Sequence, residues 1–103
     1  MNISEALLAL LEYREVTMIK GITQSGFEFE LDENIFDDFE LVELFAKVDK
    51  NPIFLGDLME KFLGAEQKKA LVEHLRDENG KVHTTAVMNA LREIEEAIPA
   101  AKN

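Results

Sequence analysis

A short segment in which apolar and acidic residues alternate constrains the fold of this chain more than any other feature. Residues 27–31 read Phe-Glu-Phe-Glu-Leu, with the period of two that a strand requires when one of its faces is buried. Residues 16–22 before it are mostly β-formers, and residues 23–26, Thr-Gln-Ser-Gly, supply a turn. We therefore expect an antiparallel hairpin. Its inward-facing residues should be Phe27, Phe29 and Leu31.

A two-stranded hairpin is only marginally stable in water, so other elements must cover its apolar face. Helices are the expected cover, because apolar residues recur at intervals of three and four in one segment before the hairpin and in four segments after it. The helices are expected over residues 3–15, 37–49, 51–63, 65–77 and 84–98. The predicted fold class is α+β: an N-terminal helix and a β-hairpin followed by four short helices packed as one small domain.

Polar residues and glycine mark the ends of these helices. A capping-box pattern indicates Asp37 as the residue that caps the first helix after the hairpin. Asn51, which is followed by a proline at the first helical position, should cap the next helix. Gly64 suits the C-terminal end of that helix, since glycine adopts a positive φ without strain. Thr84 or Thr85 is expected to cap the last helix.

The chain has 103 residues, which is enough for one packed core but not for two. We expect a helical N-terminal extension over residues 1–16, a single domain over residues 17–98 and a frayed tail over residues 99–103. Glu5 interrupts the apolar run at the N-terminus and no small-residue cleavage site follows, so the run does not resemble a signal peptide. No stretch approaches the roughly 18 uninterrupted apolar residues of a membrane span. We therefore expect a soluble protein.

Residue types that usually carry catalysis or bind metals are scarce. Cysteine is absent, which excludes thiolate nucleophiles, thiolate zinc sites and disulfides. His74 and His83 are nine residues apart, a spacing that matches neither a helical zinc site nor a zinc finger. Nothing resembles the constellation of an activated serine with a histidine and a carboxylate. We expect no catalytic residue, no metal and no cofactor, and a protein that is not an enzyme.

Negative charge is concentrated in one third of the chain. The net charge is −10, and residues 28–60 carry eleven acids and two bases whereas residues 61–103 carry seven of each. A field of this sign repels phosphate backbones and anionic lipid, so direct binding to nucleic acid or to a membrane surface is disfavoured. The simpler interpretation of the acidic segment is solubility. The alternative is a docking face for a basic partner.

Most of the seven phenylalanines lie in or beside the same acidic segment, and they exceed what a small core strictly requires. The majority should be buried, but a minority left exposed would form an apolar patch suited to a partner helix. Acidic residues beside such a patch would keep it soluble. The candidate partner-binding residues are Phe36, Phe39, Glu40, Glu43 and Phe54.

Several strings occur in an order that resembles a known family. They are Ser25-Gly-Phe-Glu-Phe-Glu-Leu-Asp-Glu33, Phe36-Asp-Asp-Phe-Glu-Leu-Val-Glu43, Asn51-Pro52, Leu63-Gly-Ala-Glu-Gln-Lys-Lys69 and Glu73-His-Leu-Arg-Asp-Glu-Asn-Gly-Lys-Val82. Together they resemble the tail assembly chaperones of long-tailed phages and prophages, particularly those of Gram-positive hosts. The resemblance covers residues 17–97. One departure is Phe39, where similar sequences often carry tryptophan.

The resemblance implies a non-catalytic protein that binds the tape measure protein while the tail tube polymerises. The major tail protein is a second candidate partner, and self-association remains open. The implied location is the cytoplasm of the bacterial host, with no copy in the mature virion. Related chains often begin just before the first strand, so Met1 and Met18 both remain candidate start residues. Whether a frameshifted longer product exists is also left open.

A different class of function remains as an alternative. A small acidic phage protein can mimic DNA and inhibit a host nucleic-acid-binding protein such as a nuclease or a repressor. Such a mimic would need acids spread along a surface at the spacing of phosphates. The neutral balance of residues 61–103 does not favour that arrangement.

Overall fold

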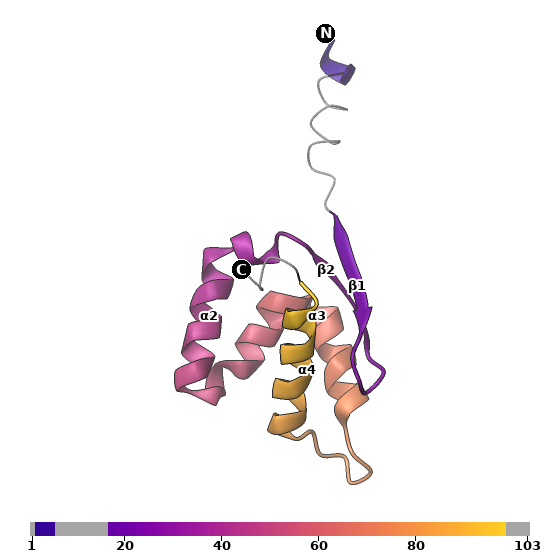
Figure 1. Ribbon diagram of the computed structural model, residues 1–103, viewed down its shortest axis with the longest axis vertical. Helices are drawn as coiled ribbons and strands as arrows, with labels where there is room; N and C mark the ends of the chain where they lie inside the picture. Colours follow the sequence, from indigo (N-terminus) through magenta and orange to yellow (C-terminus); the bar gives the residue numbers. More distant parts are fainter. Residues whose placement is uncertain (1, 6–16, 99–103) are drawn as a thin grey trace.

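The computed structural model describes residues 2–5 and 17–98 (Figure 1). Over residues 17–98, a β-hairpin is followed by three helices of seven or more residues, with a short 3₁₀ turn before each of the first two. The elements are β1 (Met18–Ile22), β2 (Glu28–Asp32), η1 (Ile35–Asp37), α2 (Phe39–Lys50), η2 (Pro52–Phe54), α3 (Leu55–Leu75) and α4 (Thr84–Glu96). This is the predicted α+β class, with two of the four helices expected after the hairpin joined in α3.

The expected N-terminal extension and C-terminal tail fall largely on undescribed residues. A helical turn covers residues 3–5, within the helix predicted over residues 3–15. Residues 6–16 of that helix and of the expected extension 1–16 lie outside the described residues, and so does the expected tail over residues 99–103. The prediction of one domain over residues 17–98 stays a prediction.

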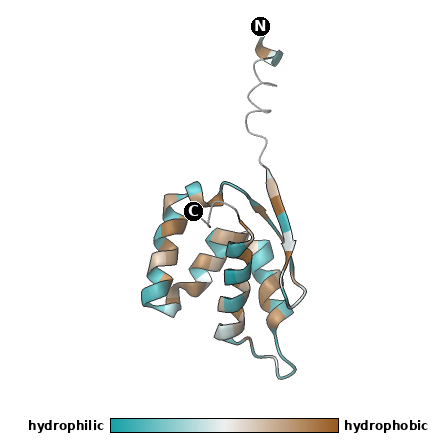
Figure 2. Ribbon diagram, in the orientation of Figure 1, coloured by the Kyte–Doolittle hydropathy of each residue, from teal (hydrophilic) through white to brown (hydrophobic). Residues whose placement is uncertain are grey.

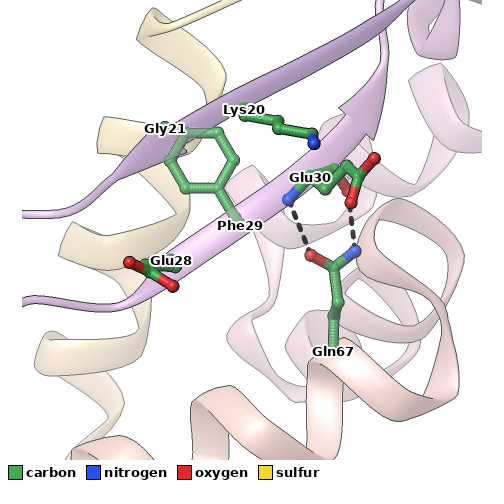
Figure 3. A pocket seen from close by; sticks show the side chains of 6 residues that line it. All are labelled: Lys20, Gly21, Glu28, Phe29, Glu30 and Gln67. Carbon is green, nitrogen blue, oxygen red and sulfur yellow. Dashed lines mark hydrogen bonds between the residues drawn. The ribbon is translucent and has the colours of Figure 1, made fainter.

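The predicted hairpin is confirmed. Its two strands are antiparallel and pair Ile19 with Leu31 and Gly21 with Phe29. Gly21 is required by this register, because a Cβ atom there would lie 2.6 Å from Cζ of Phe29. The phenylalanine ring therefore packs across the glycine (Figure 3). As expected, Phe27, Phe29 and Leu31 are buried.

Side chains of α3 hold the hairpin in place. The amide of Gln67 accepts a hydrogen bond from the backbone N–H of Glu30 at 2.8 Å and donates one to the carbonyl of the same residue at 2.8 Å (Figure 3). About two turns further along α3, Nε2 of His74 lies 3.0 Å from the carbonyl oxygen of Ser25, in the turn of the hairpin. The middle of β2 and the turn before it are thus fixed to the same helix.

The core lies between the hairpin and the three helices, and each helix carries hydrophobic and hydrophilic stretches (Figure 2). Phe62 is buried at its centre, with ring centroids 5.4 Å from Phe45 and 5.9 Å from Phe36. The last helix buries the stripe that its spacing predicts. The residues of this stripe are Val87, Leu91 and Ile94, and Ile98, predicted as the fourth, is also buried but lies two residues beyond the end of α4. No helix within residues 17–98 or 2–5 is long and apolar enough to cross a membrane.

Two of the four helices predicted after the hairpin follow one another at Gly64 with no loop between them. The helices expected over 51–63 and 65–77 form the single element α3, whose backbone leaves the helical conformation only at Gly64, with φ 82° and ψ 159°. The ammonium nitrogen of Lys68 lies 3.7 Å from the position a Cβ would take on Gly56. In a straight helix these residues would be about 18 Å apart along the axis. The chain therefore bends sharply at Gly64, as Figure 1 shows.

Two of the predicted caps are wrong by one residue. Asp38, not Asp37, caps α2, because the 3₁₀ turn η1 takes up Asp37 and leaves Asp38 extended, with its carboxylate accepting hydrogen bonds from two N–H groups of the first turn. His83, not a threonine, precedes α4, and its side chain makes no capping hydrogen bond. Asn51 accepts from the N–H of Ile53 as expected, but at the start of the 3₁₀ turn η2.

The turn between α3 and α4 is closed by Asp77. Its Oδ1 accepts hydrogen bonds from the backbone N–H groups of Asn79 and Lys81, both at 2.9 Å, and its Oδ2 lies 2.9 Å from Nε2 of His83. The hydrogen bond from Lys81 and the contact with His83 lower the pKa of Asp77 below its usual value of 3.8. The charged carboxylate therefore stabilises the folded state.

Replacing Asp77 by alanine should lower the melting temperature at pH 7, because the turn loses three hydrogen-bond acceptor contacts. A lowered pKa stabilises the fold above the unfolded-state value, and this contribution disappears as the pH falls through the folded-state value. The difference between wild type and Asp77→Ala should therefore shrink below about pH 4. Thermal unfolding at pH 7 and pH 3 measures it, with Glu78→Ala in the same turn as the control. A difference that stays constant over this range would contradict the assignment.

Candidate protein-docking surface on α2

Three of the five candidate partner-binding residues share an exposed surface, and two do not. Phe39, Glu40 and Glu43 are all exposed on α2. Phe36 is half-buried, with its ring centroid 5.5 Å from that of Phe45 in the core. Phe54 is also half-buried, with Nζ of Lys47 5.6 Å from the centre of its ring. The candidate surface is therefore centred on α2 and not on the loops that flank it.

Phe39 is the side chain that most distinguishes this surface. It is the first residue of α2, and 72% of its surface is exposed. Leu41 and Val48 are buried, and they direct the opposite side of the helix toward the core. A phenylalanine so exposed contributes little to folding, because it remains in contact with water in the folded state.

The start of α2 is held by Asp38, so the direction in which Phe39 projects is fixed. The carboxylate of Asp38 accepts from the N–H of Glu40 at 3.0 Å and lies 3.2 Å from Nζ of Lys61 on α3. Partial burial raises the pKa of Asp38, but the hydrogen bonds from Lys61 and from the N–H of Leu41 outweigh it and leave the pKa below the usual value. The cap is therefore ionised at neutral pH, where negative charge near a helix N-terminus is favourable.

Two further apolar residues extend the exposed surface along α2. Val42, three residues after Phe39, is 45% exposed, and Ala46 follows on the next turn and is also exposed. Residues spaced by three and four lie on one side of a helix. We call the surface formed by Phe39, Val42 and Ala46 the α2 patch. Glu40 and Glu43 border it.

Val42 was missed as a candidate in the sequence, although helical spacing could have found it. Ile53 was also missed, and it is 78% exposed in η2. It follows the C-terminal end of α2, whereas Phe39 is at the N-terminal end. The helix between them is about 17 Å long. Ile53 is therefore a separate exposed residue and not part of the α2 patch.

Both histidines contact groups that hold turns of the fold. His74 contacts the carbonyl of Ser25, and His83 contacts Asp77 in a turn. Within the part of the chain that the structure describes, no group of three or more histidine, aspartate or glutamate side chains could hold a metal ion. The site can therefore offer apolar contact and negative charge, which are properties of a binding surface.

An open hollow of about 500 Å³ lies over the hairpin (Figure 3). Its polar lining includes Lys20, Glu28 and Glu30, and the amide of Gln67 already bonds the backbone of β2. No nucleophile is paired with a base in this lining. The lining of this hollow therefore adds no candidate catalytic group.

No protein-family model matches the chain, and searches of the curated proteins and of the solved structures find no match either.

Proposed function

We propose that this protein is a tail assembly chaperone of a long-tailed phage or prophage, which binds the tape measure protein during assembly of the tail tube. The observation that carries the proposal is the α2 patch, where Phe39 is exposed beside Val42. The ordered resemblance of residues 17–97 supports it. The protein acts by binding and catalyses no reaction.

An apolar patch of this kind suits the expected partner. Long amphipathic helices expose apolar stripes before they assemble, and such stripes bind to apolar surfaces on other proteins. Aromatic side chains are enriched among the residues that contribute most to such binding. Glu40 and Glu43 keep the surface soluble and attract basic residues of the partner. Binding then shields the apolar stripe from aggregation.

The proposal also specifies the binding partners of the protein and the place where it acts. The tape measure protein is the principal partner, and the major tail protein is the second candidate. Binding takes place in the cytoplasm of the bacterial host, and the protein is absent from the mature virion. Neither nucleic acid nor a membrane takes part.

Replacing Phe39 by alanine should weaken capture of the tape measure protein about tenfold or more, because truncation of a central aromatic side chain commonly costs about 2 kcal/mol of binding. Co-purification with the tape measure protein of the same phage, followed by titration of the complex, measures the effect. Because Phe39 is exposed, the melting temperature of the Phe39→Ala variant should equal that of the wild type. Ile53→Ala is the matched control, because Ile53 is equally exposed but lies outside the α2 patch.

Charge reversal tests the border of the patch. Glu40→Lys and Glu43→Lys should weaken capture more at low salt than at high salt, because salt screens exposed charges. If these variants and Phe39→Ala all bind as the wild type does, the patch is misplaced. If the wild type captures no tail protein, the proposed function itself fails. Recovery of a host nuclease or repressor instead would favour the DNA-mimic alternative.

A further inference from the structure

A second surface lies between α2 and α4, where the two helices flank the beginning of α3. Phe45 of α2, Leu58 of α3, and Met88 and Leu91 of α4 form its apolar walls and floor. Met88 and Leu91 are three residues apart and lie on one side of α4, and the packing of this side beside α2 and α3 forms the groove. Met88 is the most exposed of the four, and it lies at the mouth of the groove.

The size of this groove restricts what it can bind. Its volume is about 120 Å³. Sites for small organic ligands usually have volumes of about 300–1,000 Å³. An apolar cavity of about 150 Å³ is enough to bind benzene. The groove therefore has room for one large apolar side chain and is too small for a typical cofactor.

Charge at the rim of the groove is predominantly negative. Asp49 of α2 and Glu95 of α4 line it together with one base, Arg92. Partial burial, followed by repulsion from Asp49 and Glu96, raises the pKa of Glu95 despite the opposing effect of Arg92. Among residues 17–98, no basic side chain lies within ion-pair distance of Asp49 or Glu95. A basic side chain from a partner would relieve the repulsion between these carboxylates.

We propose that this groove binds an amphipathic helix of a partner protein, which inserts one apolar side chain between α2 and α4 and places a lysine or arginine against Asp49 and Glu95. The volume of the groove fits one apolar side chain, and the negative charge of its rim favours a basic residue next to that side chain. A second copy of this acidic chain is a poor occupant, because its net charge of −10 opposes the same rim.

The proposal goes beyond tail assembly and does not depend on the α2 patch. The α2 patch uses Phe39, Val42 and Ala46, whereas the groove uses Phe45, which faces the core side of α2. A test with synthetic peptides needs no tape measure protein. If the groove binds no peptide, the proposed role in tail assembly is unaffected. If the tape measure protein is not captured, the proposed role of the groove is unaffected.

Two peptides of about 15 residues, long enough for partial helix formation, provide the probe. They share the same leucine positions, and one carries lysines where the other carries glutamates. Titration into the isotope-labelled full chain, followed by amide resonances in NMR, locates and measures binding. The lysine peptide should shift the resonances of Phe45, Asp49, Met88 and Glu95, and the glutamate peptide should bind about tenfold or more weakly.

Variants of the rim and the mouth make the test specific. Glu95→Gln should weaken binding of the lysine peptide about two- to fivefold, the range for a partly exposed ion pair. Met88→Lys should weaken it further, because it places a like charge at the mouth. Glu66→Gln makes the same charge change at an exposed residue of α3, outside the groove, and should leave binding unchanged.

Several results would overturn the proposal. These are equal affinity for the two peptides, no binding of the lysine peptide, shifts confined to the α2 patch, and an unchanged affinity in Glu95→Gln and Met88→Lys. Resonances of the groove that move with protein concentration, without peptide, would instead assign it to a second copy of this chain.

Discussion

Replacing Phe62 by alanine should lower the free energy of unfolding by about 3–5 kcal/mol, the range for removing a large buried aromatic side chain. Only 1% of its surface is exposed, and its ring meets Phe45 edge to face at a centroid distance of 5.4 Å. Phe36 packs against the same ring from η1. The substitution therefore removes the centre of a cluster that joins η1, α2 and α3, and it leaves a cavity that these elements can only partly fill.

Urea unfolding followed by circular dichroism measures this change. Because domains of this size are stable by about 5–15 kcal/mol, Phe62→Ala could remain unfolded, and Phe62→Leu provides a milder variant that should cost less. Phe54→Ala is the matched control, since Phe54 is only half-buried and should cost less than Phe62. Equal losses at positions 54 and 62 would show that the aromatic cluster does not determine stability.

Replacing Gly64 by alanine should lower the free energy of unfolding by about 1–3 kcal/mol. The backbone there has φ 82° and ψ 159°, a conformation that is accessible almost solely to glycine. No atom lies within 4 Å of the position of the added Cβ, so the cost comes from the backbone and not from a clash. Relief of the strain would require α3 to straighten, which would pull its two halves away from the core.

The same helix contains a control for this substitution. Gly56 has ordinary helical geometry, and its added Cβ would meet only the flexible end of Lys68 at 3.7 Å. Gly56→Ala should therefore raise the free energy of unfolding by about 0.5–1 kcal/mol, because alanine favours helix. Opposite signs at the two positions, measured by urea unfolding, are the expected outcome. A neutral Gly64→Ala would contradict the bend in α3.

Much of the fold could be predicted because local pattern and burial agree. The alternation over residues 27–31 specified both the strand and its buried face, and the spacing of Val87, Leu91 and Ile94 specified the buried face of α4. The residues that cap the helices were harder to predict, because two neighbouring residues can both accept hydrogen bonds from the first helical turn. Asp37 and Asp38 are chemically equivalent candidates, and the 3₁₀ turn that decides between them depends on how Phe36 packs.

The bend in α3 shows where local signals were insufficient. Gly64 was recognised as a residue that ends a helix, and its positive φ confirms this. Whether the chain then continues as a separate helix or as one bent element depends on tertiary contacts such as the approach of Lys68 to Gly56. Those contacts join residues that are twelve positions apart, beyond the range of helical periodicity.

Only part of the candidate site could be read from the sequence. Phe36 lies in the 3₁₀ turn η1, outside the regular helices, so no periodicity showed that it turns toward the core. Phe54 is in phase with Leu58 and Phe62, so the spacing of the helix predicted over residues 51–63 already indicated its partial burial. Phe39 could be placed, because it lies off the stripe that begins at Leu41. The groove had no sequence signal, since Phe45 and Leu91 are brought together only by the packing of α2 and α4 on α3.

The two hydrogen bonds of Gln67 also limit the pairing of another extended chain with the exposed edge of β2. An exposed strand edge offers unpaired N–H and C=O groups to any extended chain, and in many proteins it is a starting point for aggregation. At Glu30 of β2 both groups are occupied by the amide, which takes the place of a neighbouring strand. A protein proposed to stay beside long unassembled chains thus keeps the middle of its β2 edge closed to them.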